Sequence, residues 1–591
     1  MRRARGMGLG LGEDKREGGF AVSAASRRRG SSSSQKRPVF ARIEDWGAKI
    51  GLLLPGMTRI NKMRGSAGVC AAVLVLMLCG GLAARQDASH PASNQGSQGS
   101  QAATTQPAQS RGTGVAPQGV KLVPQMPAAG PPRPFHFPSA AAKTLPNGLR
   151  VFVVTDHSEP AVAAELLILS AGTIKDPPQM PGVAEMTANL LTQGTEKRSA
   201  QEIAEAIDFV GGSLSASAGA DASAVSLSIM KKDLPLGLDL MSDIVLHPAF
   251  RTEELERQRQ QLLSGFAVNY SDPNYLASTV FSRVVYGTSP YGWPGEGTPE
   301  TVAKLSRDNV VNFHDSEYAP NHSLLAFAGD ITPDEAFAAA EKYFGGWRKL
   351  TVPPSQPAAA SPVTGLHIWL IDKPGSVQTQ IRAGSQGIRR SDPNYIPALV
   401  TNRIFGGGYN SRLNTEVRVK KGLTYGASSS FNSHRYAGSL AVATYTRTEK
   451  TVETTQLVVQ LITQMSTGNV TPQEMDFARD YLAGVYPIQS ETAEQVAGRV
   501  LTVAAFGLPA DYNSTYPARV RGVTEAQVQA MAQRYFTPDN LEIVLAGNVA
   551  AFRDALKAAF PKASYQEIPY NQLDVLAPDL RKPAAPAAAV Q

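Results

Sequence analysis

The hydrophobic positions of this 591-residue chain form strand-like patterns that occur twice, at nearly constant spacing. Short β-rich runs begin at Leu149 ("LRVFVV") and at Leu366 ("LHIWLI"), 217 residues apart. Each block closes with an aromatic-x-Pro sequence, an apolar strand and a glycine, from Tyr318 ("YAPNHSLLAFAGD") and from Phe536 ("FTPDNLEIVLAGN"). An Asp-Pro turn recurs at an offset of 216 residues. Landmarks that share one offset indicate an internal duplication, so we predict a duplicated α+β domain.

Segments with helical period alternate with these strands in the first block. Ser199 and Glu202 form a capping box ahead of "AQEIAEAIDFVGG", which predicts a helix that ends at the Gly-Gly pair. The alternating stretch 213–229, "SLSASAGADASAVSLSI", predicts a strand with small side chains. The stretches 231–248 and 252–270 have helical period. The block is therefore predicted to mix β and α elements.

Composition sets the boundaries of the two blocks. Stretches rich in Pro, Ala, Ser, Gln or Gly lack periodic apolar residues and are predicted to be linkers or disordered. The predicted organisation is a non-native or leader extension (1–56), a signal peptide (57–84), a disordered linker (85–140), a first domain (141–350), a Pro/Ala linker (351–363), a second domain (364–572) and a disordered tail (573–591).

The uncharged apolar run 67–84 follows basic residues and ends in small ones, the layout of a secretory signal peptide. Met57 or Met63 is then the natural first residue, and the chain is expected to be exported, to the periplasm or another extracytoplasmic site. Two alternatives stay open. The run approaches the length that spans a bilayer, so it could tether the chain. The Arg- and Ser-rich beginning could instead be a mitochondrial transit peptide, which its acidic residues disfavour.

Charge and cysteine content exclude several classes of function. The net charge is +7, but residues 1–64 contain 15 Lys/Arg and 5 Asp/Glu, a net of +10, which leaves 7 − 10 = −3 for the remainder. A slightly acidic body does not favour nucleic acid as a partner. Both cysteines, Cys70 and Cys79, lie in the signal run. The mature chain is therefore expected to lack disulfides, thiol catalysis and Cys-ligated zinc.

One helical segment of the first block, "GVAEMTANLLTQGT", resembles the zinc helix of the pitrilysin/insulinase family of inverted zincins, G-L-A-H-F-L-E-H-M-L-F-K-G-T. The two zinc-binding histidines of that family fall on Glu185 and Asn189, and its catalytic glutamate falls on Ala188. The third family ligand, a downstream glutamate, falls at Ser264-Gly265, where no acid occurs. No two of the eight histidines lie three or four residues apart, so no helix presents a histidine pair. We expect no metal to be bound by this chain.

A segment of the second block, "FGGGYNSRLNTEVRVKKGLTYGASSSF", matches the family's second-domain motif, which resembles G-G-G-x-x-S-R-L-F-x-E-x-R-E-K-x-G-L-A-Y. Arg418 and Tyr425 have the seven-residue spacing of the family's Arg/Tyr pair. The resemblance implies that Arg418 orients substrate and that Tyr425 donates a hydrogen bond to the developing oxyanion. It also places Gly406, Gly407 and Gly408 near substrate. The alternative for these glycines is a tight turn between helices.

The resemblance covers most of residues 141–572 and implies fold and function together. It implies an α+β fold of two tandem homologous domains, each a mainly antiparallel sheet of about six strands packed against helices, which form one half of a clam-shell. The family's zinc motif is absent from this chain and its Arg/Tyr motif is present. This combination predicts a zinc-free subunit, inactive alone, of an exported heterodimeric metallopeptidase. The partner would carry H-x-x-E-H and the zinc, and the substrates would be unfolded peptides. The alternative is a structural or peptide-binding homologue with no proteolytic role, like the core subunits of respiratory complexes.

Overall fold

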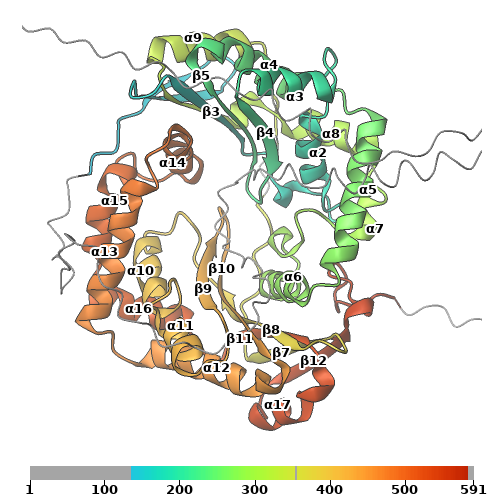
Figure 1. Cartoon of the computed structure of the whole chain (residues 1–591), viewed down its shortest axis with the longest axis vertical. Coiled ribbons are helices and arrows are strands. Elements are labelled where there is room, and N and C mark those ends of the chain that lie inside the picture. Colours follow the sequence, from blue (N-terminus) through green and yellow to red (C-terminus); the bar gives the residue numbers. More distant parts are fainter. Residues whose placement is uncertain (1–134, 353–355, 584–591) are drawn as a thin grey trace, which may run out of the picture. The chain divides into compact units, whose positions relative to one another are not determined.

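The computed structural model describes residues 135–352 and 356–583 (Figure 1). The leader extension, the signal peptide and most of the first predicted linker lie outside these residues. No helix within the described ranges is long and apolar enough to cross a membrane.

Each half of the described chain contains one six-stranded sheet. The strand order of the first sheet is β1-β2-β6-β3-β5-β4. Its strands are β1 (Ala141–Thr144), β2 (Arg150–Thr155), β3 (Ala161–Ile168), β4 (Ser213–Ala218), β5 (Ser223–Met230) and β6 (Ser323–Gly329). The strand order of the second sheet is β12-β7-β11-β8-β10-β9. Its strands are β7 (Leu366–Asp372), β8 (Gln378–Gln386), β9 (Ala427–Ser433), β10 (Gly438–Arg447), β11 (Leu541–Gly547) and β12 (Ser564–Pro569).

The two strand orders match at five positions and differ at one edge. In both sheets the strand that closes the block pairs in parallel with the first long strand and antiparallel with the next one, as β6 does with β2 and β3. The edge strand β1 precedes its sheet in sequence and runs antiparallel to β2, whereas β12 follows its sheet and runs parallel to β7. The predicted duplication is therefore visible in the topology, apart from the added edge strand.

Helices cover both sheets. Those of the first half are α2 (Val183–Leu191), α3 (Ala200–Phe209), α4 (Leu234–Leu246), α5 (Thr252–Asn269), α6 (Pro273–Tyr286), α7 (Pro299–Val302), α8 (Arg307–Glu317) and α9 (Pro333–Phe344). Those of the second half are α10 (Tyr395–Phe405), α11 (Arg412–Asn414), α12 (Thr451–Thr467), α13 (Pro472–Ile488), α14 (Ala493–Phe506), α15 (Tyr512–Arg521), α16 (Glu525–Tyr535) and α17 (Arg553–Ala559). Each half has its own large apolar core between sheet and helices.

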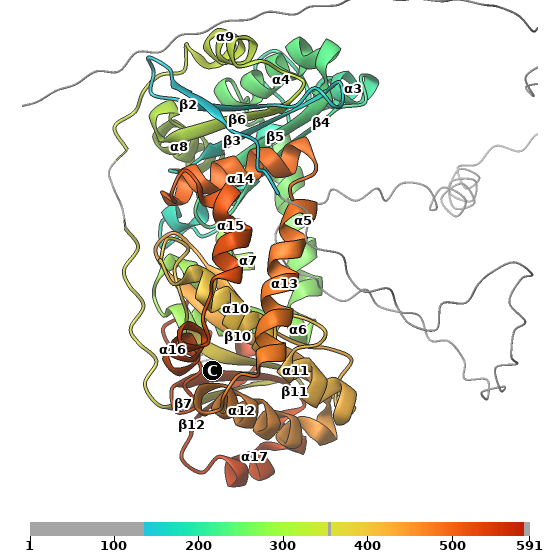
Figure 2. The same cartoon turned by 90° about the vertical axis from the view of Figure 1, so that its left-hand side faces the viewer.

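One helix of each half packs on the sheet of the other half, and we call these two helices, α6 and α14, the exchanged helices. Helix α6 of the first half packs on β8 and β11 of the second sheet, where Leu276 and Val280 join a cluster with Ile371 and Val544. Helix α14 of the second half packs on β2, β3 and β6 of the first sheet, and its buried Leu501 belongs to a separate cluster there (Figure 2). Each sheet thus has a local core on one face and a helix from the other half on the opposite face.

In each sheet one central strand carries a charged residue beneath the helix from the other half. Glu165 on β3 and Arg382 on β8 are 217 residues apart, the offset of the duplication. Arg382 donates hydrogen bonds to Ser278 Oγ and Asn274 Oδ1 of α6. Glu165 lies under α14 near Gly498, whose added Cβ would stand 3.4 Å from Glu165 Oε2. The exchanged helices therefore cover a polar as well as an apolar surface.

Three sequence predictions are corrected by the structure. The stretch 213–229 forms a β-hairpin of β4 and β5 instead of one strand. The predicted disordered tail is wrong at its beginning, because Leu573 and Leu580 are buried against the second sheet. The predicted first linker is wrong at its end, because the ring of Phe135 packs edge-on against Tyr486 at 5.8 Å between centroids. Both errors have the same cause. Apolar side chains that pack against the domains occur there within Pro- and Ala-rich sequence, which is typical of linkers.

Candidate functional site

Helix α2 contains the three positions that correspond to the zinc motif. Its start is held by the side chain of Asp176, which accepts hydrogen bonds from the amides of Gly182 (2.7 Å) and Ala184 (3.0 Å). Burial raises the pKa of Asp176 to about 8, although these amide bonds favour its ionised form. Ala188, at the position of the catalytic glutamate, is fully buried. The helix is thus anchored, and Ala188, at the position that corresponds to the catalytic glutamate, belongs to the core.

Glu185 and Asn189 lie half-buried on one face of α2. Burial, followed by the charge of Glu296, raises the pKa of Glu185 to about 7. Glu296 is itself held by the hydroxyl of Tyr275, which donates to its Oε1 at 3.0 Å. The position of the first histidine therefore holds a carboxyl that shares its surroundings with a second acid. Glu185 can hold a proton near neutral pH, but this position lacks the nitrogen ligands of a zinc site.

The third ligand position offers no replacement. Ser264 is exposed on α5, which packs against α2, and a Cβ at Gly265 would meet nothing within 4 Å. Across residues 135–352 and 356–583, no group of three His, Cys, Asp or Glu side chains is arranged to hold a metal ion. The first half therefore keeps the frame of the zinc helix without a ligand set.

Arg418 lies in a distorted helical turn of the second half. Helix α11 begins after Ser411, whose hydroxyl accepts from the Asn414 amide, and continues as a π-helical turn, η5 (Thr415–Lys420). Gly422, at a φ of +60°, ends this segment. The Arg418 guanidinium lies over the ring of Tyr409, 5.1 Å from its centroid. Single π-turns are frequent at functional sites because they redirect a side chain.

Tyr425 is exposed although its backbone is firmly held. The hydroxyls of Thr444 and Thr446 donate to the carbonyls of Gly426 (2.9 Å) and Leu423 (2.8 Å), on either side of it. The Tyr425 side chain is nevertheless 82% exposed. The backbone around Tyr425 is therefore fixed, while its ring is open to solvent.

The glycine-rich loop is explained by close packing inside the chain. A Cβ at Gly406 would stand 2.3 Å from the Oγ of Ser429, and a Cβ at Gly408 would stand 2.1 Å from Nη1 of Arg403. Neither glycine has a left-handed φ. Gly407 packs against the backbone of Arg403 and against Asn402. Gly406 requires glycine most strictly, because a Cβ there would also stand 2.8 Å from the backbone nitrogen of Ser429, whereas a Cβ at Gly408 would meet only the flexible end of Arg403. This packing agrees with the tight turn that was the alternative to substrate binding.

Exposed aromatic side chains continue from this loop onto α13, where sequence analysis placed no function. Phe477 and Tyr481 are exposed and stack at 6.4 Å between centroids. The guanidinium of Arg403 lies 3.3 Å from the Tyr481 ring centroid on one side and against Gly408 on the other. The four-residue spacing of Phe477 and Tyr481 on an otherwise polar face of α13 was the sequence signal that could have indicated this surface. We call Tyr409, Phe477 and Tyr481 the aromatic surface.

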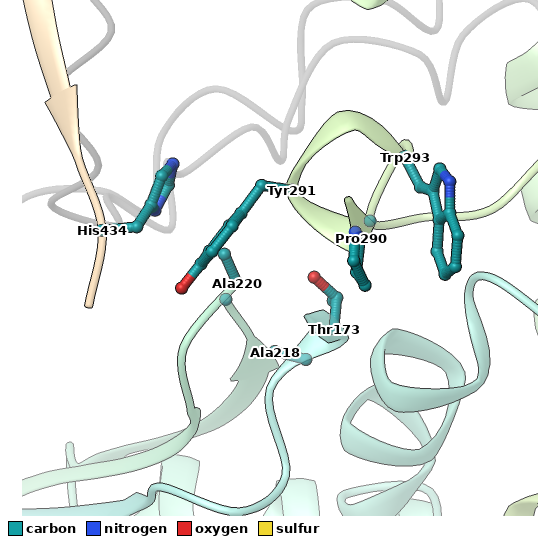
Figure 3. Close-up of a pocket in the computed structure, with 9 residues that line it drawn as sticks. Thr173, Ala218, Ala220, Pro290, Tyr291, Trp293 and His434 are labelled. Atoms are coloured by element: carbon teal, nitrogen blue, oxygen red, sulfur yellow. The ribbon is translucent and has the colours of Figure 1, made fainter. Parts of the chain in front are cut away.

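A cavity of about 180 Å³ lies between the β4–β5 turn, the segment after α6 and the β9–β10 turn. Tyr291 of η3 (Pro290–Gly292) stacks on His434 at 4.6 Å and donates a hydrogen bond to Asp221 at 2.5 Å. Figure 3 shows Tyr291 between His434 and Pro290. Burial lowers the pKa of His434, which favours its neutral form. The cavity is lined by none of the residues predicted to be functional.

The two predicted sites are not joined within the chain. Among the described residues, no hydrogen bond, ion pair or ring contact connects Glu185, Ala188 or Asn189 with Arg418 or Tyr425. The zinc-motif frame and the Arg/Tyr pair are therefore separate features of one subunit.

Comparisons with known proteins agree with this architecture. Residues 150–289 match the model of the insulinase family, peptidase family M16, and residues 304–482 match that of the peptidase M16 inactive domain. The chain belongs to the insulinase family of peptidases. The predicted family is thereby confirmed, and so is the predicted α+β fold of two domains.

Relatives and solved structures extend the match to most of the described chain. An uncharacterized zinc protease of Mycobacterium leprae is 28% identical over 344 residues, which cover 58% of this chain and 77% of that protein. A crystal structure of a peptidase M16 inactive domain from Pseudomonas fluorescens has a TM-score of 0.65 and 28% identity, and the match covers 69% of this chain and 98% of that one. A protease from Helicobacter pylori has the same TM-score at 18% identity and therefore shows the shared fold alone.

Proposed function

We propose that this chain is the zinc-free subunit of an exported, two-chain insulinase-type metallopeptidase. The observation that carries the proposal is the contrast between the two motifs. Glu185, Ala188 and Asn189 leave α2 without a ligand set, whereas Arg418 and Tyr425 are presented on a fixed backbone with Tyr425 uncovered. A partner with H-x-x-E-H would supply the zinc and the water-activating glutamate.

The two presented side chains would act on a peptide bound at the partner's zinc. The planar guanidinium of Arg418 matches the geometry of a backbone carbonyl or carboxylate. The Tyr425 hydroxyl would donate a hydrogen bond to the oxyanion that develops during attack by water. Because this chain lacks the zinc ligands, it should hydrolyse nothing by itself.

The aromatic surface supports a contact in this region. Aromatic side chains and arginines are enriched where proteins bind one another. Tyr409 and Tyr481 each lie against an arginine guanidinium and nevertheless remain exposed. A second chain that covers this surface would also lie near Arg418, which stacks on Tyr409.

The test is reconstitution with an insulinase-type chain that carries H-x-x-E-H, using a quenched unfolded peptide as substrate. We expect no hydrolysis by either chain alone and chelator-sensitive hydrolysis by the mixture. Tyr425→Phe should lower kcat by roughly a hundredfold, the cost of one oxyanion donor. Arg418→Ala should lower kcat/KM, and Arg447→Ala, at an exposed arginine paired with Glu449, should change neither.

Internal packing of the glycine loop favours a second candidate, a structural or peptide-binding homologue without a proteolytic role. The same assay separates the two. A complex that hydrolyses peptide equally well with wild-type and Tyr425→Phe chains, or chelator-sensitive hydrolysis by this chain alone, would contradict the proposed division of the site.

A further inference from the structure

A second cavity, of about 160 Å³, is lined by residues of helices α10, α13, α14 and α15 of the second half and by Arg390 before α10. Figure 2 shows the arrangement of these four helices. The cavity shares no lining residue with the Arg/Tyr pair, the glycine loop or the zinc-motif helix. Its lining consists of two arginines, four tyrosines and a few neutral side chains: Arg390, Arg499, Tyr395, Tyr486, Tyr512, Tyr516, Leu399, Gln489, Thr502 and Asn513. No carboxylate lines it, so its charge is wholly positive.

Both guanidiniums are covered on their faces by rings. The Arg390 guanidinium carbon lies 4.1 Å from the ring centroid of Tyr395 and 5.0 Å from that of Tyr512. The Arg499 guanidinium carbon lies 3.8 Å from the ring centroid of Tyr486. Stacking fixes the planes of the guanidiniums but uses none of their N–H groups. Their edges therefore stay available for hydrogen bonds.

The hydrogen-bonding capacity of these edges is only partly used. Arg390 donates from Nη2 to the Tyr512 hydroxyl at 3.2 Å, while its Nη1 is buried and has no partner among the described residues. Arg499 donates from Nε and Nη2 to Gln489 at 2.9 and 3.3 Å. Neither arginine forms an ion pair with a described acid. A buried charged donor without an acceptor is costly, so an anion at this place would be stabilising.

The remaining lining groups are compatible with an anion. Burial raises the pKa values of Tyr395, Tyr486 and Tyr516, so their hydroxyls stay protonated and neutral. The Tyr486 hydroxyl donates to Asn513 Oδ1 at 2.8 Å, which leaves the Asn513 amide group as a further donor. Tyr395 is the first residue of α10, where the helix dipole is positive.

We propose that this cavity is a binding site for a small oxyanion, a carboxylate or a phosphate group, held by the edges of Arg390 and Arg499. Oxyanions bind guanidinium edges through paired charge-assisted hydrogen bonds. A volume of about 160 Å³ accommodates such a group together with a short substituent or water. The bound anion would join α10, α13, α14 and α15, and it would therefore brace the helix that is exchanged onto the first sheet.

Arg519 provides a matched control. Its guanidinium carbon lies 5.9 Å from the centroid of the Tyr512 ring, on which Arg390 also stacks, but it is exposed and its charge is paired with Asp511 at 2.9 Å. The comparison of Arg390→Gln and Arg499→Gln with Arg519→Gln separates an anion site from a general effect of positive charge near Tyr512.

The experiment titrates the full chain with inorganic phosphate and, separately, with acetate by isothermal calorimetry, and follows the thermal unfolding temperature in parallel. Sodium chloride at matched ionic strength is the reference. We expect saturable binding of phosphate or acetate with a rise in Tm, a loss of at least tenfold in affinity in R390Q and R499Q, and wild-type affinity in R519Q. The anion that binds more tightly identifies the ligand class.

Two results would overturn the proposal. One is the absence of saturable binding and of any Tm rise beyond that in sodium chloride, for both anions. The other is equal affinity in wild type, R499Q and R519Q. If R390Q does not fold, R499Q decides the question. Arg499 is partly exposed and both of its hydrogen bonds end on Gln489, so its replacement should disturb the fold less.

Discussion

The protonation of the Glu165 carboxyl group is expected to affect the stability of this fold. The side chain lies beneath α14, on the face of β3 that the exchanged helix covers. Burial raises its pKa from 4.5 to about 7. Between these two pH values the folded chain holds a proton that the unfolded chain has released. The stability contributed by the neutral side chain is therefore fully present below pH 4.5 and is lost as the pH rises through 7.

Glu165→Gln removes this titration while it keeps the shape of the side chain. A pKa that moves from 4.5 to about 7 corresponds to about 3 kcal/mol once the folded chain must ionise. In urea unfolding we expect E165Q and wild type to differ by less than about 1 kcal/mol at pH 5. At pH 8 the variant should be more stable by up to about 3 kcal/mol.

The control for this measurement is Glu159→Gln, at an exposed glutamate just before β3. It should change unfolding equally at both pH values. If E165Q and wild type show the same difference at pH 5 and pH 8, the carboxyl is not desolvated by α14 and the reasoning is refuted.

Three further predictions concern packing and charge. Leu501→Ala, in the buried face of α14, should cost about 2–5 kcal/mol in urea unfolding because it leaves a cavity on the first sheet. Gly406→Ala should destabilise the chain by about 1–3 kcal/mol, and Gly406→Ala combined with Ser429→Gly should recover part of the loss, measured in the same way. Burial opposes ionisation of Glu474, but hydrogen bonds from Arg412 and Thr471 hold its pKa at about 2. Glu474→Gln should therefore lower stability at pH 7 by about 1 kcal/mol or less, and the difference should shrink as the pH falls from 4.5 towards 2.

The duplication could be predicted because its landmarks are local. Each pairs a strand with a turn residue, and both are readable without knowledge of tertiary contacts. The hairpin at 213–229 was missed because its turn is built from the same small residues as its strands. A signal was nevertheless present. Gly219 and Asp221 interrupt the stretch between the two strands, and both residue types favour turns.

The exchanged helices and the arginine cavity could not be predicted from sequence. The apolar faces of α6 and α14 show that each helix is buried, but not against which sheet. Arg390 and Arg499 come from segments about a hundred residues apart, and only the packing of α10 against α13 and α15 brings them together. At the zinc-motif helix, the loss of ligands was evident from residue identity alone, because histidine cannot be replaced by Asn189 as a nitrogen ligand.

The exchange of α6 and α14 limits how this chain can be divided. The linker 351–363 looks like a natural place to separate two modules, and each half has its own large core. A chain truncated at this linker would nevertheless expose the apolar side of α6 and uncover the first sheet at Val154 and Leu324. After duplication, each copy came to complete the other, so neither can be transplanted or produced alone without an aggregation-prone surface. The linker itself could be cut, but the two halves are expected to fold only together.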